Sequence, residues 1–119
     1  QRLAALMRWY RESLRAQLAT MIPQWEKALG VQASAWGIKK MKTRWGSCNA
    51  ASGRIWLNLE LAKSPPQCLE YIVVHELLHL LERHHNDHFI GLLDRHLPDW
   101  RSRRMLLNRA PLGHEDWDY

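Results

Sequence analysis

The sequence predicts one small domain of the α+β class, in which a long N-terminal helix and a short antiparallel β-hairpin sheet pack on a central helix, with two C-terminal helices after it. Three observations predict this architecture. Apolar residues recur every three or four positions over residues 2–22, which is the spacing of an amphipathic helix. A turn-rich segment at 49–53 separates two stretches with strand character. Residues 72–81 are apolar on most sides, as expected of a helix at the centre of a domain.

With 119 residues and 46% hydrophobic content, the chain is long enough to build a core, and we expect residues 1–119 to form a single domain. The chain begins with Gln1 rather than Met, which suggests the C-terminal fragment of a longer polypeptide, and we expect 110–119 to be a tail. The absence of a membrane-spanning apolar run and of a signal-peptide pattern predicts a protein without a membrane partner. The two cysteines fit a reducing, cytoplasmic compartment.

Proline and glycine delimit the first predicted helix. Pro23 has no backbone N–H to donate, so we expect it to interrupt the helix that begins near residue 2. Residues 24–29 can add another turn or two before Gly30, which is a typical helix stop.

A β-hairpin is expected next. Residues 36–45 have the character of a strand that leads into the tight segment 46–49. Over 54–59, odd-numbered apolar side chains alternate with even-numbered side chains that are polar or aromatic, which predicts a second strand with one buried face. The turn formers between the two stretches indicate that they pair.

The central helix has a strong start signal. Ser64 is suited to the N-cap, the prolines after it to the first turn, and Gln67 to a capping box, and the helix is expected to run to about Glu82. Asn86 or Asp87 can cap a further helix that ends at residue 96, and a last helix is expected over 98–108.

The segment His75-Glu76-Leu77-Leu78-His79 carries the groups that a zinc hydrolase needs. Residues four apart on an α-helix differ by about 40° of rotation and about 6 Å of rise, so the imidazoles of His75 and His79 can aim at one ion. Glu76 lies one position around the helix, where it can take a proton from water beside the metal. Three ionisable groups in an apolar helix need a partner, and a metal ion is the simplest; satisfied core histidines are the alternative. We therefore predict a zinc-dependent hydrolase with Glu76 as the catalytic base.

A catalytic zinc has three protein ligands and one open position. Four histidines lie downstream within reach: His84, His85, His88 and His96. The helix must end before the chain can return to the metal, and the turn before the next helix offers His84 or His85. The ten-residue interval from His75 favours His85, because other metalloproteases use the same interval.

The segment Arg-Trp-Gly-Ser-Cys at 44–48 has two interpretations. In the structural one, Trp45 lies in the core, Gly46 allows a close backbone approach and Cys48 is a small buried residue. In the functional one, part of the segment contacts substrate.

Three residues are candidates for substrate binding. Arg44, with Asn58 on the paired strand, can lie at the rim of the cleft and hold an anionic or amide-bearing substrate. Tyr71, one turn before His75, can stabilise an oxyanion, although a core or supporting role is the simpler interpretation.

The charge of the chain is uneven. Residues 1–63 hold 11 Lys/Arg and 3 acidic residues, whereas 64–119 hold 6 and 9. A peptide or protein is the favoured substrate, but the basic half can serve an anionic partner. One alternative is phosphoanhydride hydrolysis of a nucleotide at the same metal site, with the triphosphate held by Lys39, Lys40, Lys42 and Arg44. A second alternative is a nucleic-acid-tethered protein in which the zinc is structural.

At these same motifs the sequence resembles the YgjP-like zinc metallopeptidase domain family, which is related to the SprT-like proteases. Residues 41–48 are similar to that family's Arg-Trp-Gly-Ser-Cys signature and 71–80 to its helix, while His85 with Phe89 is similar to its third-histidine pattern. The likeness extends over residues 3–109.

The resemblance implies a zincin-like fold and cleavage of peptide bonds. It also implies a zinc ion bound by His75, His79 and His85, with Glu76 catalytic. The chain departs from the family pattern at Leu78, where a smaller residue is expected, and at Ile90, where Trp is common.

Overall fold

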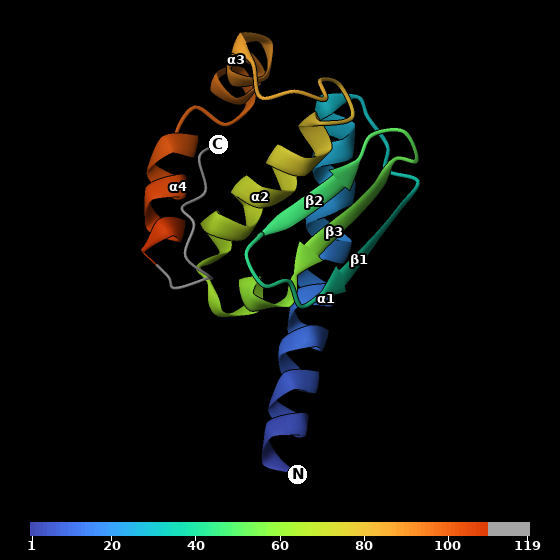
Figure 1. Cartoon of the computed structure of the whole chain (residues 1–119), viewed down its shortest axis with the longest axis vertical. Coiled ribbons are helices and arrows are strands. Elements are labelled where there is room, and N and C mark those ends of the chain that lie inside the picture. Colours follow the sequence, from blue (N-terminus) through green and yellow to red (C-terminus); the bar gives the residue numbers. More distant parts are fainter. Residues whose placement is uncertain (110–119) are drawn as a thin grey trace.

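The structure is a computed structural model that describes residues 1–109 (Figure 1). Its elements, in chain order, are α1 (Arg2–Leu29), β1 (Ala35–Lys39), β2 (Gly46–Asn49), β3 (Arg54–Asn58), the 3-10 helix η1 (Leu59–Lys63), α2 (Pro66–Leu78), α3 (Asp87–His96) and α4 (Trp100–Asn108). The α2 helix lies at the centre, with the sheet on one side and α4 on the other, and α3 lies across its upper end (Figure 1). The predicted α+β class, the long N-terminal helix, the central helix and the two C-terminal helices are confirmed. The expected tail, 110–119, lies outside the described residues.

The sheet has three strands in the order β1-β3-β2. An antiparallel hairpin is present, but its first strand is β2, with Cys48 opposite Ile55, so the expectation that 46–49 is only a tight segment after the strand is wrong. The β1 strand adds to the other side of β3 in parallel, with Trp36 opposite Ile55. The prediction of a strand over 36–45 is wrong beyond Lys39, because the chain there leaves the sheet and forms a loop.

Asn58, the last residue of β3, holds that loop in place. Its Nδ2 donates to the carbonyl oxygens of Met41 (3.0 Å) and Arg44 (2.6 Å), and its Oδ1 accepts from the backbone N–H groups of Met41 (3.3 Å) and Glu60 (3.1 Å). An amide has two donors and about two acceptor positions, so this side chain is fully used. Its exposed fraction is 0%. The prediction that Asn58 contacts substrate is therefore wrong, and the residue instead positions the loop that carries Arg44.

The α1 helix continues through Pro23, contrary to the prediction of a break. An interior proline costs about 3 kcal/mol, so packing on both sides of it must compensate. Leu18 and Ile22 before the proline are buried, and Leu29 after it is buried as well. Trp25 also donates from Nε1 to a carboxylate oxygen of Glu70 on α2 at 2.9 Å. The helix ends at Gly30 in the left-handed conformation (φ 71°), as the sequence predicts.

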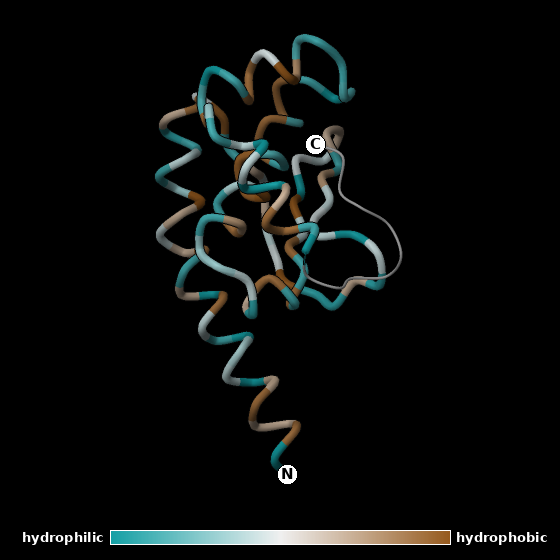
Figure 2. Tube along the Cα trace, turned by 90° about the vertical axis from the view of Figure 1, so that its left-hand side faces the viewer, coloured by the Kyte–Doolittle hydropathy of each residue, from teal (hydrophilic) through white to brown (hydrophobic). Residues whose placement is uncertain are grey.

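The first half of α1 projects beyond the rest of the domain (Figures 1 and 2). Its apolar side chains remain exposed there, including Leu3 and Trp9, whereas Leu14 and Leu18 farther along are completely buried against α2 and η1. None of the helices in residues 1–109 combines the length and the apolar character that a membrane span requires.

Both ends of α2 differ from the prediction. Ser64 ends η1, where its N–H donates to the carbonyl of Leu61, and the cap position of α2 is occupied by Pro65. At the other end, the helix stops at Leu78 rather than near Glu82. The start of α3 is as predicted, because the side chain of Asn86 accepts a hydrogen bond from the N–H of Phe89 at 3.0 Å.

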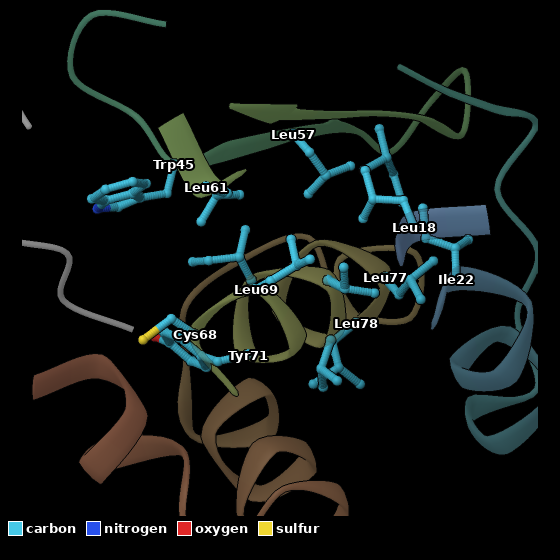
Figure 3. Close-up of a cluster of buried hydrophobic side chains, with 14 of the residues drawn as sticks. Leu18, Ile22, Trp45, Leu57, Leu61, Cys68, Leu69, Tyr71, Leu77 and Leu78 are labelled. Carbon is cyan, nitrogen blue, oxygen red and sulfur yellow. The ribbon is translucent and has the colours of Figure 1, made fainter. Parts of the chain in front are cut away.

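The hydrophobic core surrounds α2 (Figure 3). Leu57 and Leu61 approach α2 from the side of the sheet and η1, and Leu18 and Ile22 approach it from α1 (Figure 3). Cys68 and Tyr71 point to another side of α2 (Figure 3). All six side chains have an exposed fraction of 1% or less, so α2 is held rigidly from several directions.

Candidate active site

Three histidines converge where α2 ends. His75 belongs to the last turn of α2, His79 is its C-cap residue, and His85 comes from the turn that leads to α3. Their Nε2 atoms lie 3.2 Å apart for His75 and His79, 3.2 Å for His75 and His85, and 2.9 Å for His79 and His85. Tetrahedral zinc with bonds of about 2.0–2.1 Å requires nitrogens about 3.3 Å apart, so these three residues fit a metal ion.

The side chain of Glu82 organises the turn between the two helices. Its carboxylate accepts hydrogen bonds from the backbone N–H of His84 and from Nδ1 of His88, both at 3.1 Å. These hydrogen bonds hold the pKa of Glu82 at about 2. Of the histidines considered as third ligand, His88 is thus held away from the cluster by Glu82, and the turn directs His85 into it.

The hydrogen bond of His79 prepares its ring for a metal. Nδ1 lies 3.0 Å from the carbonyl oxygen of Glu82, which can only accept, so Nδ1 carries the proton and Nε2 presents its lone pair to the cluster. Burial lowers the pKa of both His75 and His79, and the neighbouring histidines lower it further. Neutral imidazoles are the form that binds a metal.

One aromatic ring supports all three imidazoles. The ring of Phe89, on α3, stacks on His79 at 4.6 Å between centroids and contacts His75 at 5.0 Å and His85 at 5.1 Å. Phe89 is completely buried. The orientation of the cluster therefore depends on how α3 is seated on α2.

Glu76 lies beside the histidines in a dry environment. Its exposed fraction is 1%, and burial raises the pKa of its carboxyl to about 8, although the charge of Arg44 opposes this shift. Its Oε2 is buried without a hydrogen-bond partner among the described residues. A carboxyl in this state can accept and return a proton near neutral pH, which is what a general base requires.

Gly46 makes room for that carboxylate. A Cβ atom at this position would lie 2.9 Å from Oε2 of Glu76, closer than Cβ atoms normally approach, and 3.0 Å from Cγ2 of Ile72, so one of these side chains would have to shift. The structural interpretation of residues 44–48 is therefore confirmed for Gly46, and also for Trp45, whose exposed fraction is 4%.

A cleft of about 460 Å³ opens over the cluster. It is lined by Arg44, Cys48, Asn49, Ala50, Glu76, His79, Arg83, His84 and His85. Arg44 is among these lining residues, so its contact with substrate remains a prediction. Burial, together with the charge of Glu76, raises the pKa of the Cys48 thiol to about 11. In the segment 44–48, Trp45 thus lies in the core, whereas Arg44 and Cys48 at its two ends line the cleft.

Tyr71 does not reach the cleft. Its exposed fraction is 0%, and its ring packs against His75 at 6.0 Å and against Trp100 of α4 at 6.2 Å. The prediction that Tyr71 contacts substrate is wrong for this reason, whereas its alternative interpretation as a core residue that supports His75 agrees with the structure. Sequence reasoning did not single out Arg83 and Asn49, which line the cleft; the signal available for Arg83 was its place in the turn between His79 and His85.

The fold and the site define a class. A buried helix with the His-Glu-x-x-His motif, a third histidine from the following turn and an open cleft above them characterise a metallopeptidase domain. A family model described as the YgjP-like metallopeptidase domain matches residues 1–110, and the chain belongs to this family.

Two solved structures share the fold. The metallopeptidase zymogen of Pyrococcus abyssi abylysin aligns with a TM-score of 0.70 and 18% identity, over 77% of this chain and 92% of that one. The metallopeptidase zymogen of Methanocaldococcus jannaschii jannalysin aligns with a TM-score of 0.67 and 19% identity, over 77% of this chain and 94% of that one. No curated protein matches the chain.

Proposed function

We propose that this metallopeptidase domain is zinc-dependent, that His75, His79 and His85 hold the ion, and that Glu76 is the general base for cleavage of a peptide bond. The observation that carries the proposal is the convergence of three Nε2 atoms, 2.9–3.2 Å apart, beside a buried carboxylate at the floor of an open cleft. Three imidazoles are a donor set that suits zinc and leaves a position for water.

Bound zinc would polarise the scissile carbonyl and make water acidic enough to attack near neutral pH. Glu76 then accepts a proton from the attacking water and returns it to the nitrogen of the leaving amine. The dry surroundings of its carboxyl favour the return step, because they disfavour the charged form. The hydrogen bond from Nδ1 of His79 to the Glu82 carbonyl keeps that ligand in the required tautomer throughout.

The edge of the sheet offers a place for an extended substrate. Among the described strands, β2 pairs only with β3, and its residues Cys48 and Asn49 line the cleft. An extended peptide can add to such an edge through backbone hydrogen bonds, which would lay its scissile bond across the histidines.

The structure gives the nucleotide alternative little support. Of the four cations considered for a triphosphate, only Arg44 lines the cleft. The ammonium of Lys39 instead lies 4.5 Å from the centre of the Trp56 ring on the sheet. A nucleic-acid tether with a structural zinc does not account for a buried Glu76 beside an open cleft. The two cysteines are free thiols, which agrees with the reducing, cytoplasmic compartment that we propose for the protein.

The decisive test is turnover by the zinc-loaded protein on a peptide library and on a panel of nucleoside triphosphates. We expect peptide cleavage, and Glu76→Gln should lower it by about 10²–10⁴-fold while the zinc content stays stoichiometric. Pyrophosphate release without any peptide cleavage would overturn the proposal, and so would full peptidase activity in zinc-loaded Glu76→Gln.

The ligand set is tested separately by metal content after dialysis. His85→Ala should lose zinc, whereas His84→Ala and His88→Ala should retain it, since only His85 brings its Nε2 to the cluster. Loss of zinc from His84→Ala alone would show that the neighbouring histidine is the ligand.

A further inference from the structure

The cleft above the histidines contains two basic residues. Arg44 lines it from the loop before β2, and Arg83 lines it from the turn after α2. Of the described residues that line it, Glu76 is the only carboxylate, and it is buried. The described lining therefore offers two arginines to a substrate and one buried carboxylate.

Arg44 lies beside the reacting centre. It lines the same cleft as Glu76, His79 and His85. In the part of the chain that the structure describes, no hydrogen bond or ion pair engages this guanidinium, although the carbonyl of Arg44 is fixed by Asn58. The loop is thus anchored while the side chain remains available.

Arg83 offers a second available guanidinium. Its side chain is exposed, and within residues 1–109 it too makes no hydrogen bond or ion pair. Arginines elsewhere behave differently: Arg103 pairs with Glu70 at 2.7 Å and with Asp99 at 3.0 Å, and Arg101 pairs with Asp94 at 2.7 Å.

The sequence around the sheet leaves Arg44 without a local counter-charge. From Lys27 to Leu59 the chain contains no Asp or Glu, although it contains six Lys or Arg. The three strands and their loops all fall in this stretch. Among the described residues that line the cleft, Glu76 is thus the one carboxylate near Arg44, and the carboxylate of a substrate can supply a second negative charge.

We propose that Arg44 and Arg83 bind a substrate carboxylate, and that the cleft selects peptides with a carboxylate next to the scissile bond. A guanidinium matches a carboxylate through paired, charge-assisted hydrogen bonds, which few other groups in a peptide can satisfy. The carboxylate has two sources in a peptide: the side chain of an Asp or Glu, or the free C-terminus. The inference rests on the proposed peptidase function and names the substrate class of the same site.

The test compares matched peptides on the zinc-loaded protein. One set differs only by Glu or Gln at each position flanking the scissile bond, and a second set differs only by a free or an amidated C-terminus. We expect the carboxylate-bearing member of one set to be cleaved with a kcat/KM about 10–100-fold higher than its neutral partner. A preference in the first set identifies a side-chain carboxylate, and a preference in the second identifies the C-terminus.

The ratio of kcat/KM for the carboxylate-bearing peptide to kcat/KM for its neutral partner should fall toward one in Arg44→Gln, in Arg83→Gln and in the double variant. The ratio is the informative quantity, because loss of Arg44 also changes the electrostatics at Glu76 and so alters the rate on every peptide. Lys42→Gln is the matched control: Lys42 is exposed on the same loop but does not line the cleft, so the wild-type ratio should persist.

A binding measurement separates this inference from the proposed function. Zinc-loaded Glu76→Gln should bind the acidic peptide about 10-fold or more tightly than its neutral partner, and added salt should reduce the difference. If no peptide is cleaved but this difference is found, the proposed chemistry fails and the carboxylate site stands. A ratio near one in the wild type, or a preference that survives in the double variant, would overturn the inference.

Discussion

The burial of Glu76 predicts that the metal-free domain loses stability as the pH rises. In the metal-free protein, burial raises the pKa of Glu76 from 4.5 to about 8. Between these values the unfolded chain ionises while the folded chain keeps its proton, so the free energy of unfolding falls by about 1.4 kcal/mol per pH unit. The stability is fully present below about pH 4.5 and is lost as the pH rises to about 8. Between about pH 5.5 and 8 the expected loss is about 3 kcal/mol.

Glu76→Gln removes this titration while it preserves the shape of the side chain. We therefore expect the free energy of unfolding of the variant to fall by about 3 kcal/mol less than that of the wild type between about pH 5.5 and 8. Urea unfolding of both proteins in the presence of a chelator measures this difference. The lowered pKa values of His75 and His79 act in the opposite sense, since they add stability as the pH rises toward about 6.5, but they act equally in both proteins and cancel in the difference. Parallel pH dependences in the two proteins would refute the reasoning.

Three individual contacts have further measurable consequences. Gly46→Ala places a Cβ 2.9 Å from the Glu76 carboxylate, so kcat/KM should fall by about 10-fold or more at unchanged zinc content, and an unaffected rate would show that this approach is unimportant. Asn58→Ala leaves two carbonyls and two N–H groups of the backbone without their partner, and urea unfolding should show a loss of about 2–4 kcal/mol; a loss below about 1 kcal/mol would contradict its anchoring role. The Cys48 thiol, with its pKa raised to about 11, should react with iodoacetamide near pH 8 far more slowly in the folded than in the unfolded protein, and equal rates would exclude the proposed burial effect.

The arrangement of the motif residues on α2 was predictable because it depends only on their spacing along the helix. The rotation per residue of an α-helix alone places His75 and His79 on one face with Glu76 beside them, and the structure agrees. The ten-residue interval to His85 was informative for a related reason, since a helix end followed by a short capped turn leaves few paths for the chain.

Residues whose conformation depends on contacts with distant parts of the chain could not be predicted correctly from the sequence. A proline ends most helices, yet α1 continues through Pro23. The burial of the apolar residues around Pro23 and the hydrogen bond from Trp25 to Glu70 stabilise the helix there. Asn58 looked available on the polar face of a strand, but the loop that returns over it uses its whole amide. Alternating polarity predicts which side chains of a strand share a face. It does not predict which other segment of the chain packs against that face.

The contact between Phe89 and the three imidazoles joins two parts of the molecule into one cooperative unit. His85 and Phe89 lie on either side of the first residues of α3, so the helix cannot shift without moving both His85 and the ring that contacts His75 and His79. By thermodynamic linkage, any ion that binds the histidines must then favour the docked position of α3 by the same free energy with which docking favours the ion. The stability of α3 should therefore depend on whether a metal is bound. Amide hydrogen exchange in α3 should be slower in the metal-bound protein than in the metal-free protein.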